Sequence, residues 1–310
     1  WVPNKYGGNG NLEAMEFFKH LNSIMNQRNP RAMIIAEEST SWPGVTKPAN
    51  EDGLGFTFKW NMGWMHDFLE YVKLDPYFRK YNHNRLTFGM TYAYSEKFIL
   101  VLSHDEVVHL KCSMLGKMPG EYEDKFANLK VAYTFMMGHP GKKLLFMGQD
   151  FGQWSEWSEK RSLDWYLLGE PEHKGLWAYF KALLHIYRKY PACYALDQYP
   201  EGFFWINADD GDRSIYSFVR CSEDGKDNLL FVCNFTPVAR PDYMVGVPQA
   251  GKYTLILDSS MKGQHIYTAV HTECDRQPYA VKYPLPAYGT AVFKFSKHTA
   301  KATKKAKKHK

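Results

Sequence analysis

Cysteine is scarce in this sequence, and its pattern already argues against some classes of protein. The 310 residues include five cysteines, an odd number with no Cys-x-x-Cys pair: Cys112, Cys193, Cys221, Cys233 and Cys274. Scattered cysteines of this kind are typical of reduced thiols in a cytosolic protein and argue against a disulfide framework or a cysteine-ligated metal. We therefore expect a cytoplasmic protein that holds no metal and no cofactor.

Long hydrophobic runs and an excess of charge of one sign are also missing from the body of the chain. The longest apolar runs, at residues 98–102 and 144–147, are far shorter than the roughly 20 residues of a membrane helix. The net charge is +6, and residues 301–310 alone contain six lysines, so the rest is close to neutral. We expect neither a membrane nor a nucleic acid as a partner, and we expect residues 298–310 to form a disordered lysine-rich tail.

The amino-terminal residues lack the pattern of a signal peptide. The sequence starts at Trp1 and shows no basic segment followed by an apolar one. We expect the chain to be the latter part of a longer protein.

What the sequence does contain is apolar material for a large core, since 45% of its residues are hydrophobic and 16% are aromatic. Helical spacing follows the N-cap Asn11 up to about residue 29 and recurs at 125–137 and 176–189. Short apolar runs, which predict strands, lie between the helices at 33–36, 56–60, 98–102 and 143–147. Apolar strands that alternate with helices predict an α/β fold with a parallel sheet covered on both faces, here of four β/α units.

Beyond Pro191 the pattern changes to short alternating runs with turn signals between them. These runs lie at residues 203–206, 214–220, 228–234, 253–257 and 290–295. They predict an all-β sandwich with its own core, able to fold by itself. The predicted domains are therefore residues 1–192, residues 193–297 and the tail 298–310.

Three of the predicted parallel strands end in acidic residues. Glu37 and Glu38 follow the first strand, Asp105 follows the third beside His104, and Asp150 follows the fourth. Because the carboxyl ends of parallel strands meet at one edge, Glu37 and Asp105 can come together although they are 68 residues apart, as a pair acting on one glycosidic bond would require. A carboxylate after a strand is also often only the N-cap of the next helix.

Tryptophans surround these acids in the sequence, at Trp42, Trp60, Trp64, Trp154 and Trp157. An indole offers a flat apolar face and an N–H edge that can stack on a sugar ring. A single tryptophan more often packs in the core. The combination of carboxylates and tryptophans indicates a carbohydrate site, but composition alone does not choose between these interpretations.

Four motifs in order give the chain a specific resemblance. They read AEESTSWPGV at 36–45, KWNMGWMHD at 59–67, LSHDEVVH at 102–109 and LFMG at 145–148. The chain resembles the 1,4-α-glucan (glycogen) branching enzymes of the α-amylase superfamily. The likeness runs from residue 1 to about 295 and includes NFTP at 234–237 in the predicted sandwich.

The resemblance implies a retaining transglycosylase on a (β/α)8 barrel, of which residues 1–192 would be the second half. It makes Glu37 the acid/base, Asp105 the stabiliser of the transition state, and His104 a ligand of sugar hydroxyls. The aspartate nucleophile would lie upstream of Trp1. Asp150 stands where the family more often has glutamate, which leaves its role open.

The same resemblance implies an α-glucan such as glycogen or amylose as the substrate, with the missing amino-terminal half as a partner. It favours Trp42, Trp60 and Trp64 as substrate-binding residues. The chain alone would then be inactive because it lacks the nucleophile. The alternatives are another glucan hydrolase of the superfamily and a non-catalytic glucan-binding fragment.

Overall fold

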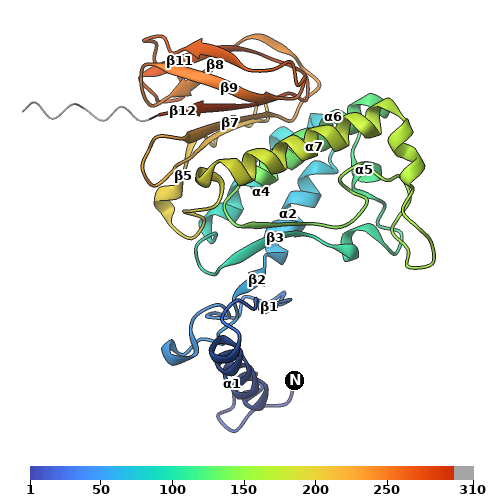
Figure 1. Cartoon of the computed structure of the whole chain (residues 1–310), viewed down its shortest axis with the longest axis vertical. Helices are drawn as coiled ribbons and strands as arrows, with labels where there is room; N and C mark the ends of the chain where they lie inside the picture. Colours follow the sequence, from blue (N-terminus) through green and yellow to red (C-terminus); the bar gives the residue numbers. More distant parts are fainter. Residues whose placement is uncertain (297–310) are drawn as a thin grey trace, which may run out of the picture.

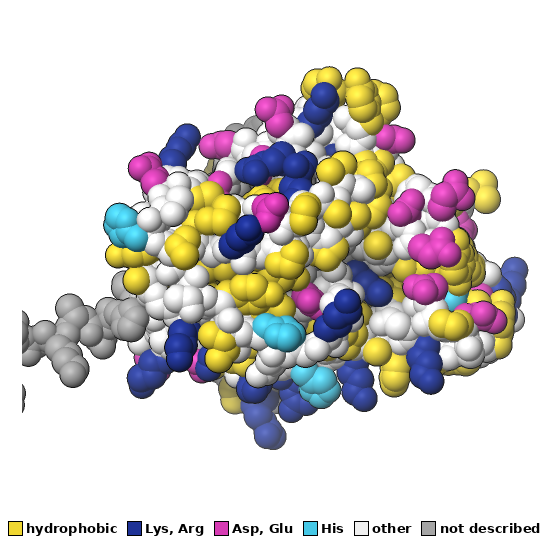
Figure 2. Space-filling view, turned by 90° about the horizontal axis from the view of Figure 1, so that it is seen from above, with side chains coloured by type: hydrophobic (Ala, Val, Ile, Leu, Met, Phe, Trp, Pro, Cys, Tyr) yellow, Lys and Arg dark blue, Asp and Glu magenta, His cyan; other side chains and the backbone are white. Residues whose placement is uncertain are grey.

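The computed structural model describes residues 1–296, which form a parallel sheet with its helices and an antiparallel β-sandwich (Figure 1). The predicted tail at 298–310 lies outside the described residues. No helix within residues 1–296 is long and apolar enough to cross a membrane. On the face seen in Figure 2, acidic and basic side chains both occur among hydrophobic ones.

The parallel sheet has four strands in the order β1-β2-β3-β4. They are β1 (Ile35–Ala36), β2 (Phe58–Trp60), β3 (Phe98–Leu102) and β4 (Lys142–Leu145). All neighbouring pairs run parallel. The four predicted strands are thus confirmed in place and direction, although β1 and β2 are shorter than their apolar runs.

The helices also follow the predicted pattern. They are α1 (Leu12–Arg28), α2 (Met62–Val72), α3 (Pro76–Arg79), α4 (Asn84–Phe88), α5 (Met114–Lys117), α6 (Tyr122–Gly138) and α7 (Pro171–Lys189). Asn11 caps α1 as expected, because its Oδ1 accepts a hydrogen bond from the Ala14 amide at 2.9 Å. Helix α7 begins five residues before the predicted start, with Pro171 in its first turn.

The sheet is covered on both faces only around β3. Four of the five residues of β3 are buried, whereas Ile35 in β1 is 41% exposed and Met33 just before it is 67% exposed. Helix α1 buries only Asn22. In Figure 1, α1, β1 and β2 extend away from the rest of the molecule. The expectation of a sheet buried throughout is therefore wrong at this edge.

The all-β region contains eight antiparallel strands. They are β5 (Phe203–Asn207), β6 (Ile215–Arg220), β7 (Asn228–Asn234), β8 (Arg240–Val247), β9 (Lys252–Asp258), β10 (His265–Thr268), β11 (Tyr279–Leu285) and β12 (Thr290–Phe295). A six-stranded sheet in the order β10-β9-β12-β7-β6-β5 faces the pair β11-β8. Five of these strands were predicted, and β8, β10 and β11 were not.

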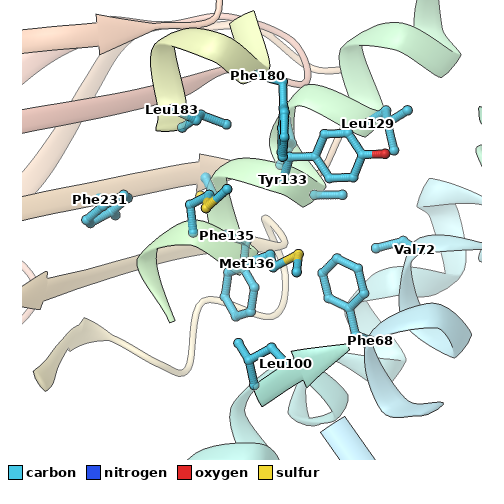
Figure 3. Packing of buried hydrophobic residues seen from close by; sticks show 14 of the residues in the cluster. Phe68, Val72, Leu100, Leu129, Tyr133, Phe135, Met136, Phe180, Leu183 and Phe231 are labelled. Atoms are coloured by element: carbon cyan, nitrogen blue, oxygen red, sulfur yellow. The ribbon is translucent and has the colours of Figure 1, made fainter. Parts of the chain in front are cut away.

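The sandwich does not stand apart, because both faces of its larger sheet are buried. One face packs on β8 and β11 through residues such as Val219 and Leu230, while the other joins the core of the α/β region. Figure 3 shows Phe231 of β7 in the same cluster as Phe135 of α6 and Leu183 of α7. The sandwich therefore has the core of its own that was expected, and its larger sheet also contributes to a second core shared with the α/β region.

Two buried arginines join the two regions. Arg79, fully buried in α3, donates to the carbonyl oxygen of Phe235 at 2.7 Å and to the Asn128 side chain at 2.8 Å. Arg220 in β6 donates to the carbonyl oxygen of Gly138, the last residue of α6, at 3.0 Å and pairs with Asp197 at 2.6 Å. Both guanidinium groups therefore bind across the interface.

Candidate active site

The carboxyl ends of β1 to β4 bring the predicted acidic residues to one edge of the parallel sheet. Glu37 follows β1, Asp105 follows β3, and Asp150 lies in the turn after β4. This edge is where parallel α/β folds place their reactive groups.

A backbone cap fixes the segment after β3. The short 3₁₀ helix His104–Val107 begins at Ser103, whose Oγ accepts a hydrogen bond from the Asp105 amide at 3.3 Å. The buried Glu106 carboxylate accepts bonds from both the amide and the hydroxyl of Ser103. The side chains of His104 and Asp105 are left about half exposed, with His104 Nε2 3.5 Å from Asp105 Oδ1. They are thus held at the sheet edge and remain open to a ligand.

The two glutamates in the segment after β1 have different surroundings. Glu38 accepts a hydrogen bond from the Thr40 amide at 2.6 Å, and bonding to Thr40 lowers the pKa of Glu38. The buried Lys59 donates to the Thr40 carbonyl at 2.8 Å, and its burial lowers its own pKa. Glu37 is exposed and has no hydrogen bond or ion pair among the contacts of residues 1–296. Glu38 is therefore tied to its loop, whereas Glu37 projects into solvent.

The structure places Glu37 and Asp105 on the same edge without direct contact. Ala36 is level with Lys59, which is level with Phe98, so β1 ends four residues before the level of Leu102. This stagger corresponds to about 13 Å along the strands. The structure shows no hydrogen bond or ion pair between Glu37 and Asp105 within residues 1–296.

A cavity of about 360 Å³ lies next to Glu38 and has aromatic walls. Its lining includes Trp42, Trp60, Tyr92 and Phe98. Glu96 at its rim accepts hydrogen bonds from the Val45 and Thr46 amides, both at 2.8 Å, which fixes the loop that carries Trp42. Sequence reasoning missed Tyr92 and Glu96, because neither lies in a recognised motif.

Trp64 does not belong to this site. It is 2% exposed and stacks on Phe68, with ring centroids 4.6 Å apart. Its position in α2, four residues before Phe68, places both rings on the core face of the helix. The expected role of Trp64 in substrate binding is therefore corrected to core packing.

The remaining predicted residues lie after β4. Trp154 is 38% exposed near Tyr122, and Trp157 packs edge-on against Phe146 at 5.2 Å. Asp150 is half-buried, and its burial raises its pKa. Within residues 1–296, no group of three or more His, Cys, Asp or Glu side chains is arranged to hold a metal ion.

Comparison with known proteins places these features in a family. Residues 205–296 match the family "Alpha amylase, C-terminal all-beta domain". A 1,4-alpha-glucan branching enzyme GlgB from Butyrivibrio fibrisolvens is 59% identical over 95% of this chain and 47% of its own length. The enzymes of the same name from Clostridium perfringens and Halothermothrix orenii are each 48% identical over 95% of this chain, and over 46% and 48% of their own lengths. The chain thus spans about half the length of these relatives.

A solved structure supports the fold independently of these sequences. An alpha-amylase from H. orenii superposes with a TM-score of 0.61 over 92% of this chain and 57% of its own, at 14% sequence identity. At that identity the likeness concerns the fold alone. Taken together, 95% of the chain is similar to about half the length of 1,4-alpha-glucan branching enzymes GlgB, and its all-β region matches the C-terminal all-beta domain of alpha amylases.

Proposed function

We propose that the chain supplies half of the catalytic domain of a 1,4-α-glucan branching enzyme, with residues 1–192 as the second half of a (β/α)8 barrel and residues 193–297 as the sandwich behind it. Four parallel strands are half of the eight in such a barrel. The exposed Ile35 and Met33 at the β1 edge suit the packing of a further strand and helix. A second polypeptide segment with the other four strands would complete the sheet.

The reaction would cut an α-1,4 bond and rejoin the freed segment as an α-1,6 branch. Glu37 would give a proton to the leaving oxygen and later take the proton of the acceptor 6-hydroxyl. Asp105 would stabilise the positive charge that develops on the sugar, and His104 would donate to its hydroxyls. The observation that carries this assignment is the capped, half-exposed pair His104–Asp105 at the edge where Glu37 also emerges.

Transfer to a sugar instead of water requires that the acceptor chain be held close to the reacting carbon. Trp42 and Trp60 in the cavity beside Glu38 offer stacking faces for such a chain. The nucleophile would come from the missing half. The buried reduced thiols of Cys193 and Cys233 support a reducing compartment such as the cytoplasm.

The test is a chimera in which the amino-terminal half of the B. fibrisolvens relative precedes residue 1. Glu37→Gln and Asp105→Asn should each lower branching by about 10²-fold or more while glucan binding stays nearly intact, because each change removes charge or a proton and little shape. The exposed Glu159→Gln serves as the control and should be as active as the parent. Retention of more than about a tenth of the activity in either site variant would contradict the assignment.

Two measurements separate this proposal from a glucan hydrolase and from a non-catalytic fragment: the products formed from amylose, and the activity of the isolated chain. On amylose, the chimera should shift the iodine stain and create branches, whereas a hydrolase of the same superfamily would release small sugars. The 310-residue chain alone should show no branching. Turnover by the chain alone would mean that another carboxylate, with Glu38 or Asp150 the first to test, serves as the nucleophile.

A further inference from the structure

The segment 107–113, which begins two residues after Asp105, has an unusual backbone. His109, Leu110 and Cys112 adopt φ values of +55°, +66° and +64°, which side chains other than glycine rarely adopt. Leu110 is 95% exposed, so burial of its side chain does not hold the segment in place. A strained conformation persists only where neighbouring groups impose it. The contacts of this segment therefore have to supply that restraint.

Lys117, in α5, closes the segment from one side. Its ammonium group donates to the carbonyl oxygen of Glu106 at 2.5 Å, to that of Cys112 at 2.6 Å, and also to that of Lys111. Glu106 is the residue after Asp105, while Lys111 and Cys112 lie at the far end of the segment. A single cation thus ties both ends of the segment together. Burial lowers the pKa of Lys117 to about 8.

Glu156, in the loop after β4, holds the same segment through its amides. Its Oε2 accepts from the Leu110 amide at 3.1 Å, and its Oε1 accepts from the Cys112 amide at 2.7 Å. These donors belong to two of the residues with positive φ. The backbone adds one more link, because the Trp157 amide donates to the Val107 carbonyl at 3.0 Å. The Lys117 ammonium thus binds backbone carbonyls at both ends of the segment, and the Glu156 carboxylate binds two of its backbone amides.

Resting on the proposed function, we propose that Lys117 and Glu156 are positioning residues that clamp the segment 107–113 and thereby fix His104 and Asp105 for the transition state. Neither side chain lines the cavity or belongs to the motifs that carry the resemblance. The Lys117 bond to the Glu106 carbonyl reaches the residue beside Asp105 directly. Loosening the clamp moves Asp105 away from the charge that it stabilises only in the transition state, so kcat falls and KM changes little.

The variants are Lys117→Met and Glu156→Gln in the chimera described above. Each has a matched control. Lys125→Met removes a half-buried lysine that also donates to a backbone carbonyl, that of Met118, outside the segment. Glu159→Gln changes an exposed glutamate three residues from Glu156. The readouts are kcat and KM for branching, and hydrogen exchange of the peptide that contains the Leu110 and Cys112 amides.

We expect each clamp variant to lower kcat by about tenfold or more with KM within about threefold, and to speed exchange in this peptide alone. Both controls should match the parent. Wild-type kcat in both variants, or faster exchange over the whole protein together with a raised KM, would overturn the proposal. If Lys117→Met does not fold, Glu156→Gln decides. If the parent chimera does not branch, the proposed function fails, and the clamp is then supported by local acceleration of exchange and overturned by unchanged exchange.

Discussion

The contact between α6 and the sandwich leads to a quantitative prediction at Gly138. A Cβ atom at this position would lie 2.7 Å from the Cε2 and Cζ atoms of Phe218 and 2.9 Å from Cδ1 of Phe231. Carbon atoms in contact rest about 3.5–4.0 Å apart, so these rings would have to move by roughly 1 Å. The two rings are stacked with centroids 5.2 Å apart, and Phe135 and Trp205 pack edge-on against Phe218. These neighbouring rings therefore restrict the movement of Phe218 that an added Cβ would require.

The expected cost follows from these contacts. Overpacking of a filled core destabilises by about 1–3 kcal/mol, and the helix preference of alanine over glycine returns up to about 1 kcal/mol. Gly138→Ala should therefore lower the free energy of unfolding by about 1–2 kcal/mol. The measurement is the urea midpoint of the 310-residue chain, followed by tryptophan fluorescence.

Gly175 in α7 provides the matched control. It is also a helical glycine, but an added Cβ there meets no atom within 4 Å. Gly175→Ala should stabilise the chain by about 0.5–1 kcal/mol. The packing argument is refuted if Gly138→Ala unfolds at the same or a higher urea concentration than the parent while Gly175→Ala behaves as expected.

Three further predictions concern other buried or site residues. Burial lowers the pKa of His139 to about 3, so between pH 6.5 and 3 the unfolded chain takes up a proton that the folded chain does not. Stability should fall as the pH falls through this window, by about 1.4 kcal/mol per unit from this group, and His139→Gln should flatten the profile from urea unfolding at several pH values. Arg79→Met should cost roughly 3 kcal/mol in the same assay, because it leaves the buried carbonyls of Val72 and Phe235 without donors; a loss under about 1 kcal/mol would contradict this. Trp60→Ala should raise KM of the chimera for amylose by about tenfold with kcat nearly unchanged, whereas an unchanged KM would exclude stacking there.

The regular elements were largely predictable because the periods of their apolar residues are strong local signals. Among the strands after residue 190 that were found from the sequence, β9 alternates between buried and more exposed residues along Lys252–Asp258, and β7 is an unbroken apolar run within Asn228–Asn234. Strands β8 and β11 contain Pro241 and Pro284, which weaken a strand pattern, and β8 also carries the exposed Asp242. They form a separate pair in the structure, which local patterns do not reveal.

The site was predictable where it depends on strand ends and not where it depends on loop contacts. Glu37 and Asp105 were found because each follows an apolar run. Trp64 was misplaced although Phe68, four residues later, already indicated a common helix face. Lys117 and Glu156 carry no such signal, because their partners are backbone atoms whose positions depend on the whole fold.

The six-stranded sheet of the sandwich packs against β8 and β11 on one face and against the α/β region on the other. This limits which segments the protein can exchange with its relatives. A sandwich inherited from another superfamily member would bring its own aromatic rings against α6, at a place where Gly138 leaves no room for even one added methyl group. Crossovers near residue 192 would therefore separate halves of one interface, although a loop there is the obvious junction. Functional hybrids should be those in which α6 and strands β6 and β7 come from the same parent.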